Sequence, residues 1–93
     1  MIKSFGNRET EALYGGRCPA AFRAFRKVAE RKLQMVEAAV ALLDLRSPPG
    51  NRLEKLGHDR AGQYSIRIND QWRICFRWHE SDAYDVEIVD YHY

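Results

Sequence analysis

Residues 63–93, QYSIRINDQWRICFRWHESDAYDVEIVDYHY, contain three runs in which apolar and polar side chains alternate. Successive side chains of a β-strand point to opposite faces, so each run predicts a strand with one apolar face. Turn-forming residues separate the runs at 69–71 and 80–82, and this spacing predicts a three-stranded antiparallel meander. The apolar face is expected to carry Tyr64, Ile66 and Ile68 from the first run, Trp72, Ile74, Phe76 and Trp78 from the second, and Tyr84, Val86 and Ile88 from the third.

The opposite face of this meander is expected to be open and charged. Alternation sends Arg67, Arg73 and Arg77 to it, together with the carboxylates Asp85 and Glu87. Ion pairs across the strands would account for Arg67 and Arg77, and each exposed pair contributes only about 0.2–1 kcal/mol. Arg73 differs because it stands at the start of the second run, close to where the C-terminal tail must emerge.

Two helices are predicted before the meander. Asn7 is a suitable N-cap for a short helix that runs through Leu13 and ends at the glycine pair that follows. Apolar residues then recur at steps of three and four over residues 20–45, which predicts a longer helix that stops at the proline-rich residues 47–50. The core-facing stripe of this helix is expected to contain Phe22, Phe25, Ala29, Leu33, Val36, Val40 and Leu43.

The remaining segments are short. Residues 1–5 alternate and predict a short strand that must pair with an edge of the later sheet. Residues 52–62 predict a turn of helix around Leu53 and Leu56, followed by a basic loop. The sequence therefore predicts a single α+β domain over residues 1–93, with two N-terminal helices on one face of a small antiparallel sheet. That sheet would consist of the short N-terminal strand and the C-terminal three-stranded meander.

Composition narrows the classes of function. The chain has 93 residues, is 45% hydrophobic and 30% charged, and has a net charge of +2, which is typical of a globular domain. No apolar stretch approaches the roughly 18 residues that span a bilayer, and the N-terminus has no signal-peptide core, so we expect a cytoplasmic protein without membrane contact. Cys18 and Cys75 lack metal-type spacing and are expected to be reduced structural thiols. Residues 1–60 hold 12 Lys/Arg against 7 Asp/Glu, which favours an anionic or acidic partner.

Several strings together resemble a known family. They are MIKSF at residues 1–5, GQYSIRIN at 62–69, WRI at 72–74 and DYH at 90–92. Through these strings the chain resembles the HigB toxins, which are plasmid-maintenance killer proteins of the RelE/ParE toxin superfamily. Because the strings lie at both ends of the chain, the resemblance covers nearly its whole length. The resemblance implies a RelE-like fold and a ribosome-dependent endoribonuclease that cleaves translated mRNA. It also implies metal-free attack by the 2′-hydroxyl without a cofactor, neutralisation by a HigA-like helix-turn-helix antitoxin, and binding of operator DNA only through that antitoxin.

The resemblance also implies roles for individual residues. Arg73 matches the family's transition-state arginine, whose guanidinium can hold two phosphate oxygens. His92 matches the C-terminal histidine and is the first choice for proton transfer, although the sequence does not assign it as acid or base. Asp90 would orient or tune that imidazole, and Tyr91 would stack on a base or hydrogen-bond the phosphate. The substrate-binding residues would be Lys55, His58, Arg60 and Arg67.

One stretch departs from the family pattern. Many relatives have a loop in the manner of LHPLKGDR, whereas residues 53–60 read LEKLGHDR, with Glu54 in place of the histidine and Gly57 in place of the lysine. Three interpretations follow. Lys55 or His58 substitutes from a neighbouring position, Glu54 serves as the base, or the second catalytic group is absent.

Two other classes of function stay open at this point. The ParE branch of the superfamily shares the fold and is thought to poison DNA gyrase without catalysis. An RNA- or protein-binding module with a basic helix face is the third reading. The SIRIND and DYH strings favour the nuclease branch.

Overall fold

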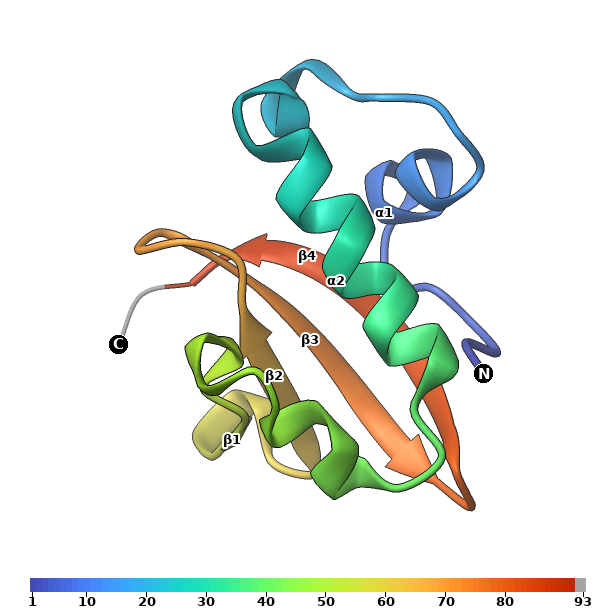
Figure 1. The fold of residues 1–93 in the computed structure, drawn as a ribbon, viewed down its shortest axis with the longest axis vertical. Helices are drawn as coiled ribbons and strands as arrows, with labels where there is room; N and C mark the ends of the chain where they lie inside the picture. The colour runs from blue at the N-terminus through green and yellow to red at the C-terminus, as the bar shows by residue number, and fades with distance from the viewer. Residues whose placement is uncertain (92–93) are drawn as a thin grey trace.

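The computed structural model describes residues 1–91, in which helices and an antiparallel sheet form two layers (Figure 1). The sheet has the strand order β1-β2-β3-β4, and every neighbouring pair is antiparallel. These four strands are β1 Glu54–Lys55, β2 Gln63–Arg67, β3 Trp72–His79 and β4 Asp82–Asp90. The helices are α1 Arg8–Tyr14 and α2 Arg26–Ala38, with short 3₁₀ helices at Ala20–Phe25, Leu42–Arg46, Pro49–Asn51 and His58–Arg60. The α+β class is as predicted. Within this range no helix has the length and apolar character needed to cross a membrane.

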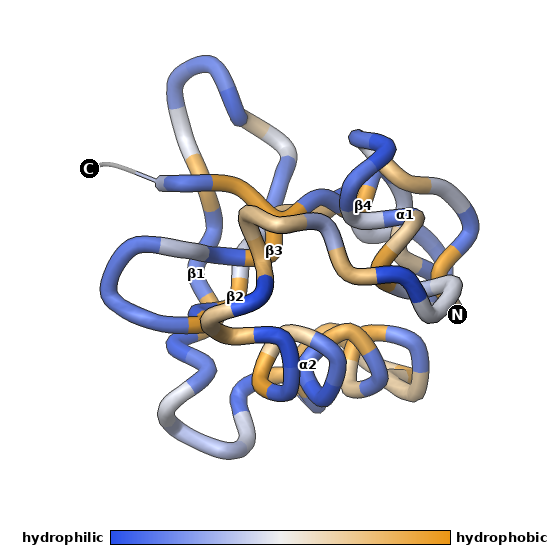
Figure 2. Tube along the Cα trace, turned by 90° about the horizontal axis from the view of Figure 1, so that it is seen from above, coloured by the Kyte–Doolittle hydropathy of each residue, from blue (hydrophilic) through white to orange (hydrophobic). Residues whose placement is uncertain are grey.

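The hydrophobic core lies between α2 and one face of the strands, which Figure 2 shows edge-on. Leu33 and Val36 of α2 are buried against this face because they fall on one side of the helix at a spacing of three. The sheet contributes residues that alternate along β2 and β3, as the period of two requires, and along β4 except at one irregularity. They are Ile66, Ile74, Phe76, Ala83, Val86 and Ile88.

The third strand departs from the predicted alternation at Asp85. A register shift lies between Cys75 and Arg77 of β3, and on the β4 side Asp85 has a positive φ of 53°. This β-bulge inserts one residue and exchanges the two faces beyond it. Ala83 is therefore fully buried, while Tyr84 pairs with Arg77 and shares its face. The prediction that Tyr84 belongs to the apolar face was wrong.

The long helix predicted for residues 20–45 is three shorter segments. The first turns are 3₁₀, α2 ends at Ala38, and the chain is extended from Ala39 before the 3₁₀ helix Leu42–Arg46. Asp44 explains the break, because its carboxylate accepts hydrogen bonds from the Val40 and Ala41 amides. Such local capping competes with helix continuation. Val40 and Leu43, which were predicted on the core stripe, are 70% and 64% exposed.

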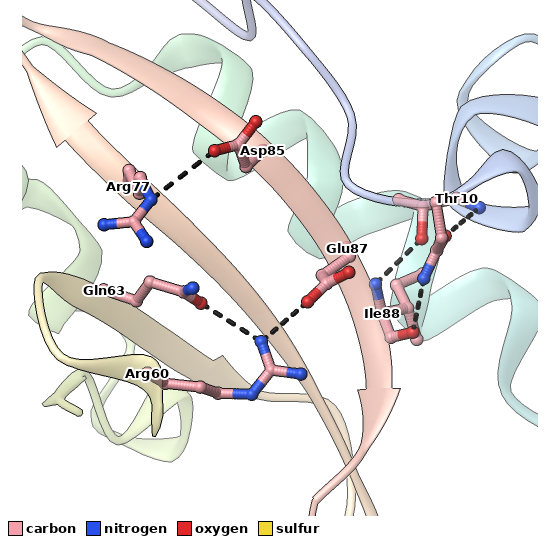
Figure 3. A network of polar contacts seen from close by, with 8 residues as sticks. Thr10, Arg60, Gln63, Arg77, Asp85, Glu87 and Ile88 are labelled. Carbon is pink, nitrogen blue, oxygen red and sulfur yellow. Dashed lines mark hydrogen bonds and ion pairs between the residues drawn. The ribbon is translucent and has the colours of Figure 1, made fainter. Parts of the chain in front are cut away.

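The two short N-terminal and central segments also differ from expectation. Residues 52–62 supply the edge strand β1, where a helical turn was predicted. Residues 1–5 do not form a regular strand. Instead Ile2 and Phe5 make isolated parallel bridges with Ala83 and Val86, so this segment covers the outer edge of β4. Helix α1 continues that cover, since the Thr10 hydroxyl accepts from the Ile88 amide at 2.8 Å (Figure 3).

Candidate active site

A pocket of about 200 Å³ opens at the end of the sheet where the β2–β3 turn meets the C-terminal end of β4. Strand pairing creates it, because Arg67 of β2 and Arg73 of β3 are directly opposite each other and so project from the same face. Two like charges opposite each other cost stability, so stability alone does not explain this pair. The lining residues are Arg52, Arg67, Asn69, Asp70, Arg73 and Tyr91.

Arg73 is the buried member of the pocket, only 4% exposed, whereas the sequence predicted it on an open face. Its Nε donates to the Ser65 hydroxyl at 2.7 Å, and its Nη2 donates to the Arg52 carbonyl at 2.6 Å. Glu54 Oε2 lies 3.9 Å from the same Nη2. These contacts fix the guanidinium plane. Within residues 1–91 no hydrogen bond or ion pair is made by Nη1, so this nitrogen is the one placed to receive a ligand oxygen.

Arg67 lies at the wall of the same pocket and is about one-third exposed. Its Nη2 forms an ion pair with Asp70, and its backbone carbonyl accepts a hydrogen bond from the buried Lys32 of α2. Burial lowers the pKa of Lys32, and the nearby cations Arg31, Arg67 and Arg73 lower it further. The helix layer thus adds a cationic group behind the strand that carries Arg67.

The β2–β3 turn shapes the pocket rim. The Asn69 side-chain oxygen accepts from the amides of Gln71 at 2.9 Å and Trp72 at 2.8 Å, which closes the turn. Gln71 then reaches the C-terminal tail, with its amide donating to the Asp90 carboxylate at 2.8 Å and its carbonyl accepting from the Tyr91 amide at 3.0 Å. Gln71 therefore holds Asp90 and Tyr91 against the turn and brings Tyr91 to the pocket.

Of the four residues expected to be catalytic, three lie in the described part of the chain. Arg73 and Tyr91 line the pocket, and Asp90 lies in β4 next to it, held by Gln71. His92 lies outside the residues that the structure describes, so its predicted role in proton transfer, and that of Asp90 in orienting it, stay predictions.

The predicted substrate-binding residues separate into two groups. Arg67 lines the pocket, whereas Lys55, His58 and Arg60 are not among its lining residues. Lys55 pairs with Tyr64, and Tyr64 pairs with the core residue Phe76, so the Lys55 side chain leaves the sheet on the helix side. His58 is exposed in the 3₁₀ helix His58–Arg60.

Arg60 is held by other residues of the protein. Its Nη1 is 2.6 Å from Glu87 Oε1 and 3.1 Å from the Gln63 side-chain oxygen, so it spans β2 and β3 to reach β4 (Figure 3). The hydrogen bond to Glu87 raises the pKa of the Arg60 guanidinium. The face predicted to be open is therefore partly covered by this arginine. Arg77 pairs with Asp85 at 3.5 Å and both are exposed, as the ion-pair reading predicted.

Cys75 lies beneath this arginine and is fully buried. Burial raises the pKa of its thiol to about 11, with Glu87 raising it further and Arg60 and Arg73 opposing the shift. The thiol is therefore protonated at neutral pH and is not a nucleophile. No group of three or more His, Cys, Asp or Glu side chains within residues 1–91 is arranged to hold a metal ion.

Sequence reasoning missed three residues that build the site. Ser65 and the Arg52 carbonyl hold Arg73, and Gln71 holds the tail. Strand pairing could have found Ser65, because it is on the arginine face two residues before Arg67. The Arg52 contact depends on a backbone with φ of 45°, which no pattern in the sequence signals.

The fold of this chain is shared with proteins of known structure. Over 100% of the chain the fold is similar to that of one chain in the YoeB–YefM complex from Staphylococcus aureus, with a TM-score of 0.57, 18% identity and 99% of that chain covered. This likeness shows a shared fold. A second structure of the heterotetrameric YoeB–YefM complex gives the same values.

Sequence comparison is more specific. The model of the HigB-like toxins, described as RelE-like toxins of type II toxin–antitoxin systems, matches residues 19–92. Toxin HigB-1 of Vibrio cholerae is 43% identical over 63 residues, which are 68% of this chain and 66% of that protein. An uncharacterised protein of Haemophilus influenzae is 37% identical over 72% of this chain and 66% of its own length, so the matches span just under two thirds of these two relatives. Endoribonuclease HigB of Proteus vulgaris is 31% identical over 99% of this chain and all of its own. The chain belongs to the HigB-like toxin family.

Proposed function

We propose that this chain is an endoribonuclease toxin that cleaves mRNA on the translating ribosome. The observation that carries the proposal is the pocket in which Arg52, Arg67 and Arg73 meet Tyr91. Three guanidinium groups in a small concave site suit phosphate, because the planar donor set matches phosphate oxygens. The relative named Endoribonuclease HigB supports the same activity.

The proposed reaction is transesterification within the RNA. The 2′-hydroxyl oxygen attacks the adjacent phosphorus and loses its proton to a base, while the bond from phosphorus to the 5′ oxygen breaks and that oxygen takes up a proton. The products are a 2′,3′-cyclic phosphate and a 5′-hydroxyl. Arg73 would stabilise the charge that accumulates on the pentavalent phosphorane, using Nη1, which makes no hydrogen bond or ion pair within residues 1–91. This proposed contact uses one nitrogen of the guanidinium, whereas the sequence led us to expect that two of its nitrogens would hold two phosphate oxygens.

The proton-transfer groups are proposed from sequence and position together. His92 remains our first candidate, with Asp90 tuning it and Tyr91 contacting a base or the phosphate. Glu54 is a further candidate base, because its carboxylate lies 3.9 Å from Arg73 and replaces the family's histidine. The metal-free route is supported by the chemistry of the lining, which among the described residues includes three arginines and one carboxylate residue, Asp70.

The test is expression in cells, followed by mapping of transcript 5′ ends. We expect the wild type to arrest growth and to produce new 5′ ends inside translated regions. Arg73→Ala and His92→Gln should lose both effects, and Arg17→Ala, an exposed arginine away from the pocket, should keep them. Growth arrest that persists in folded Arg73→Ala without RNA ends, together with a DNA-damage response, would favour gyrase poisoning instead.

We also propose that a HigA-like helix-turn-helix antitoxin neutralises this toxin and supplies the contacts with operator DNA. The structures similar to this fold are toxin–antitoxin complexes, which supports a protein partner. The basic residues of the N-terminal half would suit an acidic or mixed-charge surface. Co-expression with the neighbouring reading frame should restore growth and yield a copurifying complex, and growth that is not restored would contradict this partner.

A further inference from the structure

The pocket contains its own anion. Asp70 lines it beside the three arginines, and its carboxylate is paired with Nη2 of Arg67. We propose that Asp70 is an internal competitor for the RNA phosphate, occupying Arg67 until a nucleic acid displaces it. This inference rests on the proposed function, since it concerns how the same pocket selects its ligand.

The ion pair has little to do with holding the fold. The Asp70 side chain is 100% exposed, so its pairing with Arg67 is worth little to stability. The turn that contains Asp70 is closed by Asn69, which accepts hydrogen bonds from the Gln71 and Trp72 amides. Because Asn69 does this work, the Asp70 carboxylate is left with the arginine as its hydrogen-bonding partner among residues 1–91.

Carboxylate and phosphate oxygens compete for the same guanidinium donors. A phosphate that binds Arg67 must first separate it from Asp70, and the short, exposed Asp70 side chain can turn to solvent without moving the strands. A small anion has the contacts of a single phosphate with which to offset this exchange. A polynucleotide presents several phosphates to Arg52 and Arg73, whose guanidinium groups are not paired with Asp70, so it can offset the loss more fully. Asp70 would thus favour extended RNA over small phosphates.

The experiment measures binding, separately from cleavage. The probe is a fluorescent 2′-O-methyl RNA octamer, which has no free 2′-hydroxyl to attack, titrated with the full chain at low ionic strength. Asp70→Asn should lower Kd by about two- to fivefold, the range that corresponds to removing one exposed ion pair. Asp59→Asn is the matched control, because it removes one negative charge from an exposed carboxylate that does not line the pocket.

A second variant tests whether the effect passes through Arg67. In an Arg67→Ala background there is no competition to relieve, so Asp70→Asn should tighten binding no more than Asp59→Asn does. If Asp70→Asn and Asp59→Asn have equal effects in the wild-type background, the competitor role is wrong. If Arg52→Ala and Arg67→Ala both bind the octamer as tightly as Arg17→Ala, the pocket is not the RNA site and the proposed function itself fails.

Discussion

At the scale of single residues, the burial of Arg73 is better explained by a functional role than by the stability of the fold. A buried guanidinium is costly unless its donors are satisfied, and here Ser65 and the Arg52 carbonyl satisfy Nε and Nη2 in one orientation. An apolar residue of similar volume would serve packing without this arrangement. The geometry therefore favours a positioned charge in a residue that lines the pocket.

Arg73→Lys tests whether the guanidinium geometry matters beyond its charge. Lysine keeps the charge but lacks the Nε that bonds Ser65, so it cannot present a fixed donor edge. We expect a loss of cleavage rate of about 10²-fold. Denaturant unfolding should show destabilisation of about 1–3 kcal/mol with the fold retained. Wild-type cleavage by this variant would contradict the role of the guanidinium.

The Cys75 thiol should be unreactive in the folded protein. Burial raises its pKa to about 11, so the folded chain prefers the neutral thiol and the thiolate becomes accessible only in strongly alkaline solution. Because the pKa is raised on folding, the stability that the neutral thiol contributes is present below about pH 9 and declines as pH approaches 11. In Cys18→Ser, iodoacetamide labelling followed by mass spectrometry should find Cys75 protected at pH 8 and labelled after denaturation. Rapid native labelling would contradict its burial.

At the scale of elements, α1 and the N-terminal segment cover the outer edge of β4. The Asn7 side chain joins α1 to β4, since its oxygen accepts from the Thr10 amide at 2.9 Å and its nitrogen donates to the Ile88 carbonyl at 3.3 Å. Covering an edge in this way blocks pairing with other chains. The role assigned to this region is structural.

Asn7→Ala should therefore reduce stability and leave catalysis intact. Loss of the N-cap is expected to cost about 0.5–2 kcal/mol in the free energy of unfolding, measured by urea denaturation. Cleavage per folded molecule should match the wild type at low temperature, because the substitution is remote from the pocket lining. A catalytic defect without a stability change would contradict the purely structural role of Asn7.

The β2–β3 turn contacts the C-terminal end of β4 through Gln71, which bonds Asp90 and Tyr91. Gln71→Ala removes the amide that holds Asp90, while the exposed position predicts little change in unfolding free energy. Misplacing the tail by about 1 Å can cost up to about 10²-fold in rate, so we expect a clear fall in cleavage with an unchanged Tm. Gln34→Ala on α2 is the matched control. Equal activity of the two variants would show that cleavage does not depend on the hydrogen bond between Gln71 and Asp90.

Element patterns were predictable where burial imposes a period. The alternation of β2 and β3 gave their faces correctly, and the Asn7 cap was confirmed. Asp85 was not predictable as a bulge, because an inserted residue leaves no composition signal and changes the face of every earlier residue of the strand. The two-residue strand β1 is too short to show a period, and the break after Ala38 depends on a side-chain cap by Asp44.

At the scale of the whole molecule, the site forms where distant segments converge. Strand pairing brings Arg67 and Arg73 together, and this could be anticipated from the meander. Alternation alone could not show that Arg60 bonds Glu87, or that Lys55 leaves the sheet on the helix side. These depend on the path of residues 52–62, which carries no strong pattern. Arg52 enters the pocket by the same path.

The central claim is that the arginine pocket cleaves mRNA during translation. The most direct measurement uses a reconstituted translation system with labelled mRNA, comparing wild type, Arg73→Ala and Arg17→Ala after each variant is shown to be folded. The account predicts fragments ending in 2′,3′-cyclic phosphate and 5′-hydroxyl from the wild type and Arg17→Ala, only while ribosomes translate, and none from Arg73→Ala. Cleavage by folded Arg73→Ala at the wild-type rate, or no cleavage by the wild type on translating ribosomes, would contradict it.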